Sequence, residues 1–366
     1  MAELGIIGFG QSGKSTVFNA VTRGRAATGY GGSQEPQVGA VKVPDRRLDV
    51  LTGLFKPKKT TPAEIRYVDF PAAGSAFGRG QGPGSQFLNE LRRMEGLIHV
   101  VRAFASPEVA HPEGSIEPAR DIESMNLELN FADLALIERR LERLRAELRS
   151  AKAGDRMTGE REMALLVRLQ EGLESELPVR AQTISADEQR LIGSYRFLTA
   201  SPMLLLLNIG EDVVDRREAI EQEFTARCQQ PGTSVAAFCG KLEMELLDLS
   251  PEEAVEYRAE LGLGEETGLA RAIRLSYHLL GLLSFLTAGE DEVRAWTVTR
   301  GATAPTAAGK IHSDLERGFI RAEVVRYDDL IGAGSMVEAK KRGLVRMEGK
   351  SYTVQDGDIM NILFNV

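Results

Sequence analysis

The chain has 366 residues, of which 43% are hydrophobic and 27% are charged, as is usual for a soluble globular protein. Its net charge of −8 argues against diffuse attachment to nucleic acid, so we expect no DNA partner, although a local basic patch is compatible with it. The sequence shows no apolar run of membrane-spanning length and no secretory signal, and its two cysteines, Cys228 and Cys239, favour idle thiols over a disulfide or zinc site. We therefore expect a cytoplasmic protein of two or three domains with no membrane partner.

A glycine-rich stretch near the start of the chain carries the strongest functional signal. Residues 8–16 read GFGQSGKST and match the pattern G-x-x-x-x-G-K-[ST], directly after an apolar strand candidate at residues 4–7. A helix can begin at Ser15, so backbone N–H groups of the loop and the N-terminus of that helix can bind phosphate. A chance glycine-rich turn is the weaker alternative. We expect Lys14 to reach the β- and γ-phosphates of a nucleoside triphosphate and Ser15 to ligate Mg²⁺. The residues expected to bind the nucleotide here are Gly10, Gln11, Ser12, Gly13, Lys14, Ser15 and Thr16.

Strand candidates alternate with helical stretches along most of the chain. They span residues 4–7, 38–43, 64–70, 96–104, 203–209 and 234–239. This alternation predicts an α/β fold with a mainly parallel sheet. Asp69, near the end of the third candidate, is expected to hold the Mg²⁺ shell, and Ser33, in a glycine-bearing loop, to supply a second hydroxyl. For Asp69 the alternative is a solvent-facing residue at the end of a strand.

Between residue 122 and about residue 178 the pattern becomes helical. Apolar residues recur at spacings of three and four, and a second apolar series returns after a polar turn at residues 151–155. The first series is Leu134, Ile137, Leu141, Leu144 and Leu148, and the second is Leu166, Leu169, Leu173 and Leu177. These seams predict an antiparallel coiled-coil hairpin inserted in the nucleotide-binding domain.

Basic residues outnumber acidic ones around the tip of this hairpin. They are Arg139, Arg140, Arg143, Arg145, Arg149, Lys152, Arg156 and Arg161. Such a set can neutralise RNA phosphates, whereas a solvent face with ion pairs one helical turn apart explains it equally well.

A base-reading segment follows the apolar strand candidate at residues 203–209. Nucleotide switches that prefer guanine carry N-K-x-D at this place, but here Asn208 is followed by Ile209 and, two residues later, by Glu211. The longer carboxylate moves the acceptor that guanine needs, and the apolar residue offers a different stacking wall, so we expect ATP to bind better than GTP. Cys239 and Gly240, after the next strand candidate, are expected to complete the base pocket.

The last eighty or so residues change character. Strand candidates begin at Ser284 and recur at residues 293–298 and 321–327, with a short helix near residues 309–317. Turns around residues 347–354 and a final strand candidate at residues 358–364 follow. This order predicts a small β-grasp domain.

At this point the chain resembles the YchF-type Obg-like ATPases nearly from end to end. The first stretches that carry the likeness are Glu35-Pro36, Val43-Pro44-Asp45, Lys56-Pro57-Lys58-Lys59, Val68-Asp69, His99-Val100-Val101-Arg102 and Asp121-Ile122-Glu123. The C-terminal stretches match most closely: Val293-Arg294-Ala295-Trp296-Thr297, Ile311-His312-Ser313-Asp314, Gly318-Phe319-Ile320-Arg321 and Val354-Gln355-Asp356-Gly357-Asp358. The resemblance implies a cytosolic P-loop protein that hydrolyses ATP in preference to GTP and associates with ribosomes or ribosomal RNA.

Together with the element order, the resemblance predicts three domains. A P-loop domain of the Obg type is expected at residues 1–121 and 186–281, a coiled-coil insertion at 122–185, and a TGS β-grasp domain at 282–366.

The chain departs from this family where the chemistry is expected. Gln11 replaces an asparagine, and the family's Asp-x-Ala-Gly becomes Asp69-Phe70-Pro71-Ala72, which removes a glycine from the γ-phosphate side and adds a rigid proline. No glutamine or histidine follows Ala72 to orient water, so hydrolysis at Lys14 should be slow. Arg79 and His111 are the further catalytic candidates, and for each the alternative is a solvated loop side chain. The alternatives are a nucleotide-gated binding module that does not hydrolyse, and a GTP-dependent ribosome-associated GTPase.

Overall fold

The computed structural model describes residues 2–22, 24, 36–71, 85–106, 109–150, 152–264 and 266–365. The described residues form two compact units. Residues 40–65 belong with the C-terminal part from residue 273 onward, and the remaining residues up to 272 form the second unit. The predicted boundaries at residues 121, 185 and 281 stay a prediction, because contacts between segments do not define domains by themselves.

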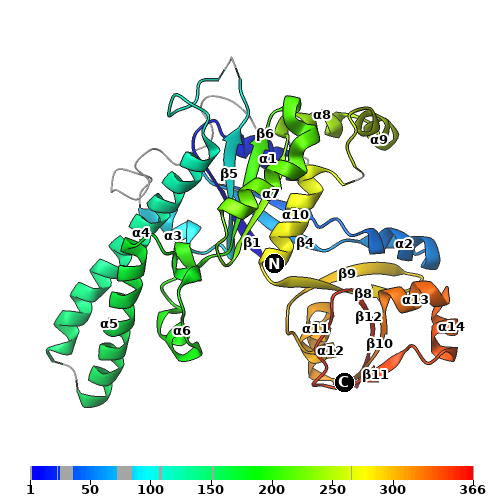
Figure 1. Ribbon diagram of the computed structural model, residues 1–366. Coiled ribbons are helices and arrows are strands. Elements are labelled where there is room, and N and C mark those ends of the chain that lie inside the picture. Colours follow the sequence, from blue (N-terminus) through cyan, green and yellow to red (C-terminus); the bar gives the residue numbers. More distant parts are fainter. Residues whose placement is uncertain are drawn as a thin grey trace. The chain divides into compact units, whose positions relative to one another are not determined.

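A mainly parallel sheet organises the larger unit, as the sequence predicts (Figure 1). Its strands follow the order β2-β4-β1-β5-β6-β7. Their bounds are β1 (Glu3–Ile7), β2 (Gln37–Lys42), β4 (Glu64–Asp69), β5 (Gly96–Ala103), β6 (Met203–Ile209) and β7 (Thr233–Phe238). β1 pairs in parallel with β4 and β5, and β6 pairs in parallel with β5 and β7. Every residue of β6 is buried, as expected for a strand covered on both faces.

The direction of these strands places the functional residues. The carboxyl ends of parallel strands lie at one edge of a sheet, which is where ligands bind in open α/β folds. The loop after β1, Asp69 at the end of β4 and Asn208 near the end of β6 therefore lie at the same edge.

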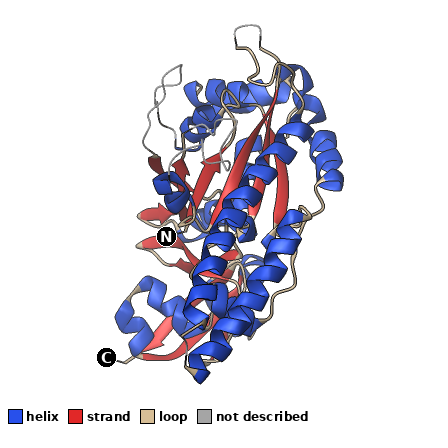
Figure 2. Ribbon diagram, turned by 90° about the vertical axis from the view of Figure 1, so that its left-hand side faces the viewer, coloured by secondary structure: helices blue, strands red, loops and turns tan. Residues whose placement is uncertain are grey.

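Helices connect the strands of this sheet and flank them (Figure 2). They are α1 (Lys14–Thr22), α3 (Ser85–Leu91), α6 (Ala186–Ile192), α7 (Arg217–Arg227), α8 (Gly240–Asp248), α9 (Pro251–Glu260) and α10 (Gly268–Leu279), with short turns of helix at η1 (Val179–Ala181), η2 (Leu198–Ala200) and η3 (Glu211–Arg216). α1, which starts at Lys14, packs against α8.

The predicted helical hairpin is formed by α4 (Pro118–Leu148) and α5 (Ala153–Glu174), which lie side by side in Figure 1. Pro118 starts α4 at a position where the missing N–H costs no helical hydrogen bond. A cluster of buried residues joins the two helices: Ile137, Leu141, Leu144, Leu165, Leu166, Leu169 and Leu173. The predicted turn at residues 151–155 is too long, since α5 begins at Ala153, and Leu177 does not extend the seam, because it follows the end of α5 and is 44% exposed.

A second sheet carries the C-terminal part of the chain. Its strands follow the order β11-β10-β12-β8-β9-β3. Their bounds are β3 (Lys59–Thr61), β8 (Leu282–Ala288), β9 (Glu292–Thr299), β10 (Phe319–Arg326), β11 (Arg346–Glu348) and β12 (Asp358–Phe364). The pairing of β3 with β9 brings an early segment into this sheet, and Arg47, in α2 (Arg46–Phe55), donates to Asp356 at 2.8 Å in the same unit.

One prediction for this part of the chain is wrong. The helix predicted at residues 309–317 is two helices, α11 (Ala304–Ile311) and α12 (Ser313–Arg317), because His312 is extended and its Nδ1 caps α12 by accepting from the Asp314 N–H. The turns predicted around residues 347–354 follow the short strand β11, which ends at Glu348, and in them the Tyr352 N–H bonds the Gly349 carbonyl. Two further helices, α13 (Tyr327–Ala333) and α14 (Met336–Lys341), were not predicted.

A buried carboxylate fixes the root of the hairpin. Asp133 on α4 is fully buried and receives a hydrogen bond from the Arg92 guanidinium at 2.6 Å. Its carboxylate also accepts from the backbone N–H of Leu198 and from the N–H and hydroxyl of Thr199, at 2.8–3.1 Å. One side chain thus ties the end of α3, α4 and η2 together.

Replacing this carboxylate should destabilise the unit that contains the hairpin. We expect Asp133→Ala to lower the free energy of unfolding by about 3–5 kcal/mol, because it leaves the Arg92 guanidinium without its buried partner. Urea unfolding followed by circular dichroism measures the change. Asp187→Ala, which removes an exposed carboxylate, is the matched control and should change the free energy by less than ~0.5 kcal/mol. Equal effects of the two substitutions would contradict the assignment.

Candidate nucleotide-binding site

The loop between β1 and α1 has a conformation that depends on its glycines. Gly8 and Gly13 have φ angles of 155° and 94°, which residues with a side chain rarely adopt. A Cβ atom at Gly8 would lie 2.5 Å from the Val100 carbonyl oxygen, and one at Gly13 would collide with the Asn208 amide. The backbone therefore curls closely at the N-terminus of α1, as a phosphate-binding loop requires.

Lys14 lies inside this loop with its ammonium group held by backbone carbonyls. Its Nζ donates to the Gly8 oxygen at 3.1 Å and to the Phe9 oxygen at 3.3 Å, and the residue is only 7% exposed. Burial lowers the pKa of Lys14 to about 8, against the opposing attraction of the Asp69 carboxylate. A phosphate group close to this ammonium would restore its preference for the charged form.

Asp69 and Ser15 meet next to the lysine, as the sequence predicts. The Ser15 hydroxyl donates to Asp69 Oδ2 at 3.3 Å, while Asp69 Oδ1 is buried and has no hydrogen-bond partner among the described residues. Burial raises the pKa of Asp69 to about 6, and Lys14 and Ser15 oppose that rise. A hydroxyl and a carboxylate with an unused oxygen fit Mg²⁺, which takes few protein ligands and fills its shell with water and phosphate oxygens.

Asn208 connects the phosphate loop to the next strand of the sheet. Its amide nitrogen donates to the Ser12 carbonyl at 3.1 Å, and its amide oxygen accepts from the Gly240 N–H at 3.0 Å. A Cβ atom at Gly240 would lie 3.1 Å from both the Asn208 oxygen and Thr16 Cγ2, so the backbone there also approaches the loop closely. In this structure Asn208 positions the loop, a role that the sequence pattern does not reveal.

The remaining residues of the predicted base pocket differ in their surroundings. Glu211 is partly exposed, and its carboxylate pairs with the Lys241 ammonium at 2.7 Å, a contact that was not predicted. Ile209 and Cys239 are only 2–3% exposed and pack in the core, so their contact with a base stays a prediction. Burial raises the pKa of the Cys239 thiol.

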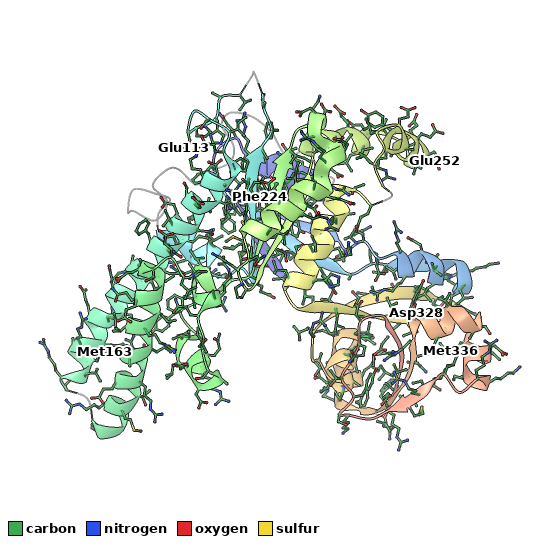
Figure 3. The ribbon with its side chains drawn as sticks, viewed as in Figure 1. Glu113, Met163, Phe224, Glu252, Asp328 and Met336 are labelled. Atoms are coloured by element: carbon green, nitrogen blue, oxygen red, sulfur yellow. The ribbon has the colours of Figure 1, made fainter. Side chains whose placement is uncertain are left out.

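Among the described residues, no hydrogen bond or ion pair joins the predicted catalytic residue His111 to Lys14. His111 Nε2 lies 2.9 Å from Asp121 Oδ2, and His111 Nδ1 accepts from the Glu113 N–H at 3.1 Å, so Nε2 carries the proton and donates it to Asp121 (Figure 3 labels Glu113). The segment that contains His111 still lies beside the phosphate loop, because a Cβ atom at Gly10 would lie 3.9 Å from Cγ of the neighbouring Pro112. Arg79, Ser33 and Ala72 lie outside the described residues.

A loop of this geometry, at the carboxyl edge of a parallel sheet, places the chain among the P-loop nucleotide-binding proteins. The YchF-GTPase C-terminal family model, described as "Protein of unknown function (DUF933)", matches residues 282–365. The chain is 42% identical to "Ribosome-binding ATPase YchF" of Bacillus subtilis (strain 168), with 99% of each chain covered. The chain therefore belongs to the YchF family.

Two further comparisons agree with this family. The protein of the same description from Escherichia coli O157:H7 is 42% identical, over 100% of this chain and 99% of that one. A solved structure described as "Structure of the Schizosaccharomyces pombe YchF GTPase" is 31% identical, with a TM-score of 0.83 and coverage of 99% and 97%. The resemblance noted from the sequence motifs is thus confirmed. Among the described residues, no helix is both long and apolar enough to cross a membrane.

The protonation of Asp69 gives a test of the metal site. The pKa of Asp69 is raised to about 6, so its carboxylate becomes protonated as the pH falls through that value. A protonated carboxyl group no longer attracts a metal cation. The gain in ATP affinity that Mg²⁺ provides should therefore fall about tenfold between pH 7 and pH 5. Calorimetric titrations with and without Mg²⁺ measure it.

Asp69→Asn is the control for this measurement. In this variant Mg²⁺ should increase the ATP affinity only slightly at both pH values. Because the phosphates of the nucleotide titrate in the same way with both proteins, comparing the variant with the native chain isolates the contribution of Asp69. A Mg²⁺ gain in the native chain that does not change between pH 7 and pH 5 would show that Asp69 does not face the metal.

Proposed function

We propose that this protein is a cytoplasmic switch that binds ATP with Mg²⁺, hydrolyses it slowly and associates with the ribosome according to its nucleotide state. The observation that carries the proposal is the set formed by the buried Lys14 and the half-buried Ser15 and Asp69 at the phosphate loop. The description of the bacterial relatives as ribosome-binding ATPases supports the activity and the partner. The fission yeast relative is described as a GTPase, so the choice of base needs its own argument.

Binding would begin at the phosphate loop. The N–H groups from Gly10 to Thr16 and the N-terminus of α1 offer donors to the phosphates, and Lys14 would exchange its carbonyl partners for phosphate oxygens. Ser15 and Asp69, together with Ser33, would hold Mg²⁺, which supplies charge neutralisation for the triphosphate. Water would complete the shell of the metal, since the protein offers few ligands.

The pair formed by Glu211 and Lys241 supports a preference for adenine. In a guanine site a free carboxylate accepts two hydrogen bonds from the base, but here the Glu211 carboxylate already accepts from an ammonium at 2.7 Å. Guanine would have to displace that contact or leave its own donors unsatisfied, whereas adenine presents a single amino group. We therefore propose ATP as the better substrate, with GTP weaker.

Slow hydrolysis follows from the state of His111. Both of its ring nitrogens are engaged, and its side chain is 4% exposed, so it must leave Asp121 before it can orient a water molecule. A histidine that has to break a buried contact in every cycle is available only part of the time. Arg79 is the other candidate for stabilising the transition state.

A second candidate function is a nucleotide-gated binding module that does not hydrolyse ATP. The engagement of His111 with Asp121 and the rigid Pro71 after the metal-binding strand favour it. In that case the nucleotide would act only as a ligand that orders the loops around it.

Phosphate release from the purified full-length protein separates these functions. We expect the native chain to release phosphate from ATP clearly above the Lys14→Ala blank, and faster than from GTP. His111→Ala should lower the rate at least about tenfold if the histidine orients water or carries a proton. A native rate equal to the blank favours the binding module, and a faster rate with GTP overturns the base assignment.

The tip of the hairpin is the proposed contact with ribosomal RNA. Two of its basic residues are neutralised, since Arg140 pairs with Glu162 and Arg156 lies 3.7 Å from Glu160. The exposed basic residues that form no ion pair among the described residues are Arg139, whose Nε donates to the Ala135 carbonyl, and Arg143, Arg145, Arg149, Lys152 and Arg161. Unpaired surface cations of this kind are free to displace counterions from phosphates.

Removing three of these charges should weaken ribosome binding. We expect the triple change of Arg143, Arg145 and Arg149 to Gln to reduce co-sedimentation with ribosomes at least about tenfold, and to flatten its dependence on salt. A triple change of Lys58, Arg190 and Arg216 to Gln removes the same charge elsewhere and serves as the control. Equal loss in both proteins would mean that only net charge matters.

A further inference from the structure

A cavity distinct from the nucleotide site lies on the same unit of the chain. It has a volume of about 230 Å³ and is bounded by α4, η1, α7 and the amino ends of β6 and β7. Ile122, Leu205 and Phe224 form much of its apolar wall (Figure 3 labels Phe224). It is lined by Met203 at the start of β6, whereas Asn208 lies five residues further along that strand, roughly 16 Å away at the usual rise.

An arginine on this cavity carries a charge that no carboxylate balances. The Arg180 guanidinium donates to the Thr199 carbonyl at 3.2 Å and to the Gln230 side-chain oxygen at 2.9 Å, and both of these acceptors are neutral. Its Nε is buried and has no partner among the described residues. Burial lowers the pKa of Arg180 to about 10, with no compensating carboxylate. A half-buried cation with a buried, unpartnered N–H is stabilised by an anion that reaches it.

Other polar groups on the cavity wall point to the same ligand chemistry. The Thr233 hydroxyl lines the cavity and is buried without a hydrogen-bond partner among the described residues. Arg227 also lines it, and its nearest carboxylate oxygen, on Glu223, is 3.8 Å away, a weak pairing. Glu123 is the acidic residue on the wall, so the two arginines leave the cavity with a positive balance.

A smaller cavity continues past the same arginine. It has a volume of about 120 Å³ and shares Arg180, Glu123, Asn126 and Gln230 with the larger one. The guanidinium therefore borders two adjoining spaces.

We propose that the larger cavity binds a small organic anion, with its carboxylate or phosphate group on Arg180 and Thr233 and its apolar part against Phe224 and Leu205. The space suits a molecule about the size of one substituted aromatic ring. Such a ligand would touch α4, η1 and α7 at once, and so would stiffen the junction between the hairpin and the sheet. The proposal is independent of nucleotide hydrolysis and of ribosome binding.

Fluorine NMR on the full-length protein tests this site with 4-fluorobenzoate as the probe. We expect line broadening at millimolar probe, and at least about tenfold weaker binding of the neutral 4-fluorobenzamide, which has the same shape without the charge. Competition by phenyl phosphate compares the two head groups: stronger displacement than by benzoate identifies a phosphate ligand, and weaker displacement a carboxylate ligand.

Three variants locate the binding. Arg180→Met should reduce binding of 4-fluorobenzoate at least about tenfold, as expected for loss of a charge-assisted contact, and Arg190→Met, at an exposed arginine, should not. Ala119→Phe, which fills the cavity from α4, should abolish binding and decides the question if Arg180→Met fails to fold. ATP titration of each variant checks that the nucleotide site is intact.

Several results would overturn the proposal. They are absence of probe binding to the native chain, equal affinity of Arg180→Met or Ala119→Phe, and displacement of the probe by ATP. Loss of probe binding in Lys14→Ala would likewise place the anion at the phosphate loop instead of at Arg180.

Discussion

The site depends on two opposite charges, those of the buried Lys14 and the half-buried Asp69. Burial disfavours the charged form of each, lowering the pKa of Lys14 to about 8 and raising that of Asp69 to about 6. Each partly compensates the other, but neither is fully satisfied, and Asp69 keeps one buried oxygen unpaired among the described residues. A polyanion and a divalent cation supply the two missing counter-charges together, which explains why such a loop is suited to a magnesium-bound triphosphate.

The rest of the site keeps that pair in place. The strand order β4-β1-β5-β6 brings the loop, Asp69 and Asn208 to one edge, and Asn208 then bonds both the loop and the start of α8. One side chain therefore connects the loop to Gly240. At the root of the hairpin Asp133 plays a comparable part, since it joins α4 to Arg92 and to η2. Arg180 also contacts η2, since it donates to the Thr199 carbonyl, but both of its acceptors are neutral. This distinguishes Arg180 from Arg92, which pairs with the Asp133 carboxylate.

Much of the architecture follows from local patterns. The predicted bounds of β6 and β12 agree with the structure, because each is an apolar segment bounded by turn residues or a clear change of pattern. The hairpin was predicted from its leucine spacing, and its core contains most of those leucines. The helix predicted at residues 309–317 failed because His312 uses its side chain to cap a second helix, and propensity does not reveal such a contact.

The sequence by itself determined the phosphate loop and the alternation of strands and helices in the larger unit, because each depends on residue type and short spacing. Tertiary structure alone decided which distant residues meet. Ser15 bonds Asp69, Asn208 bonds Ser12 across 196 positions, β3 joins β9, Glu211 pairs with Lys241, and the half-buried Arg180 has no carboxylate partner among the described residues. These contacts arise when the sheets and helices pack, and a pairing between remote positions leaves no periodic trace in a single sequence.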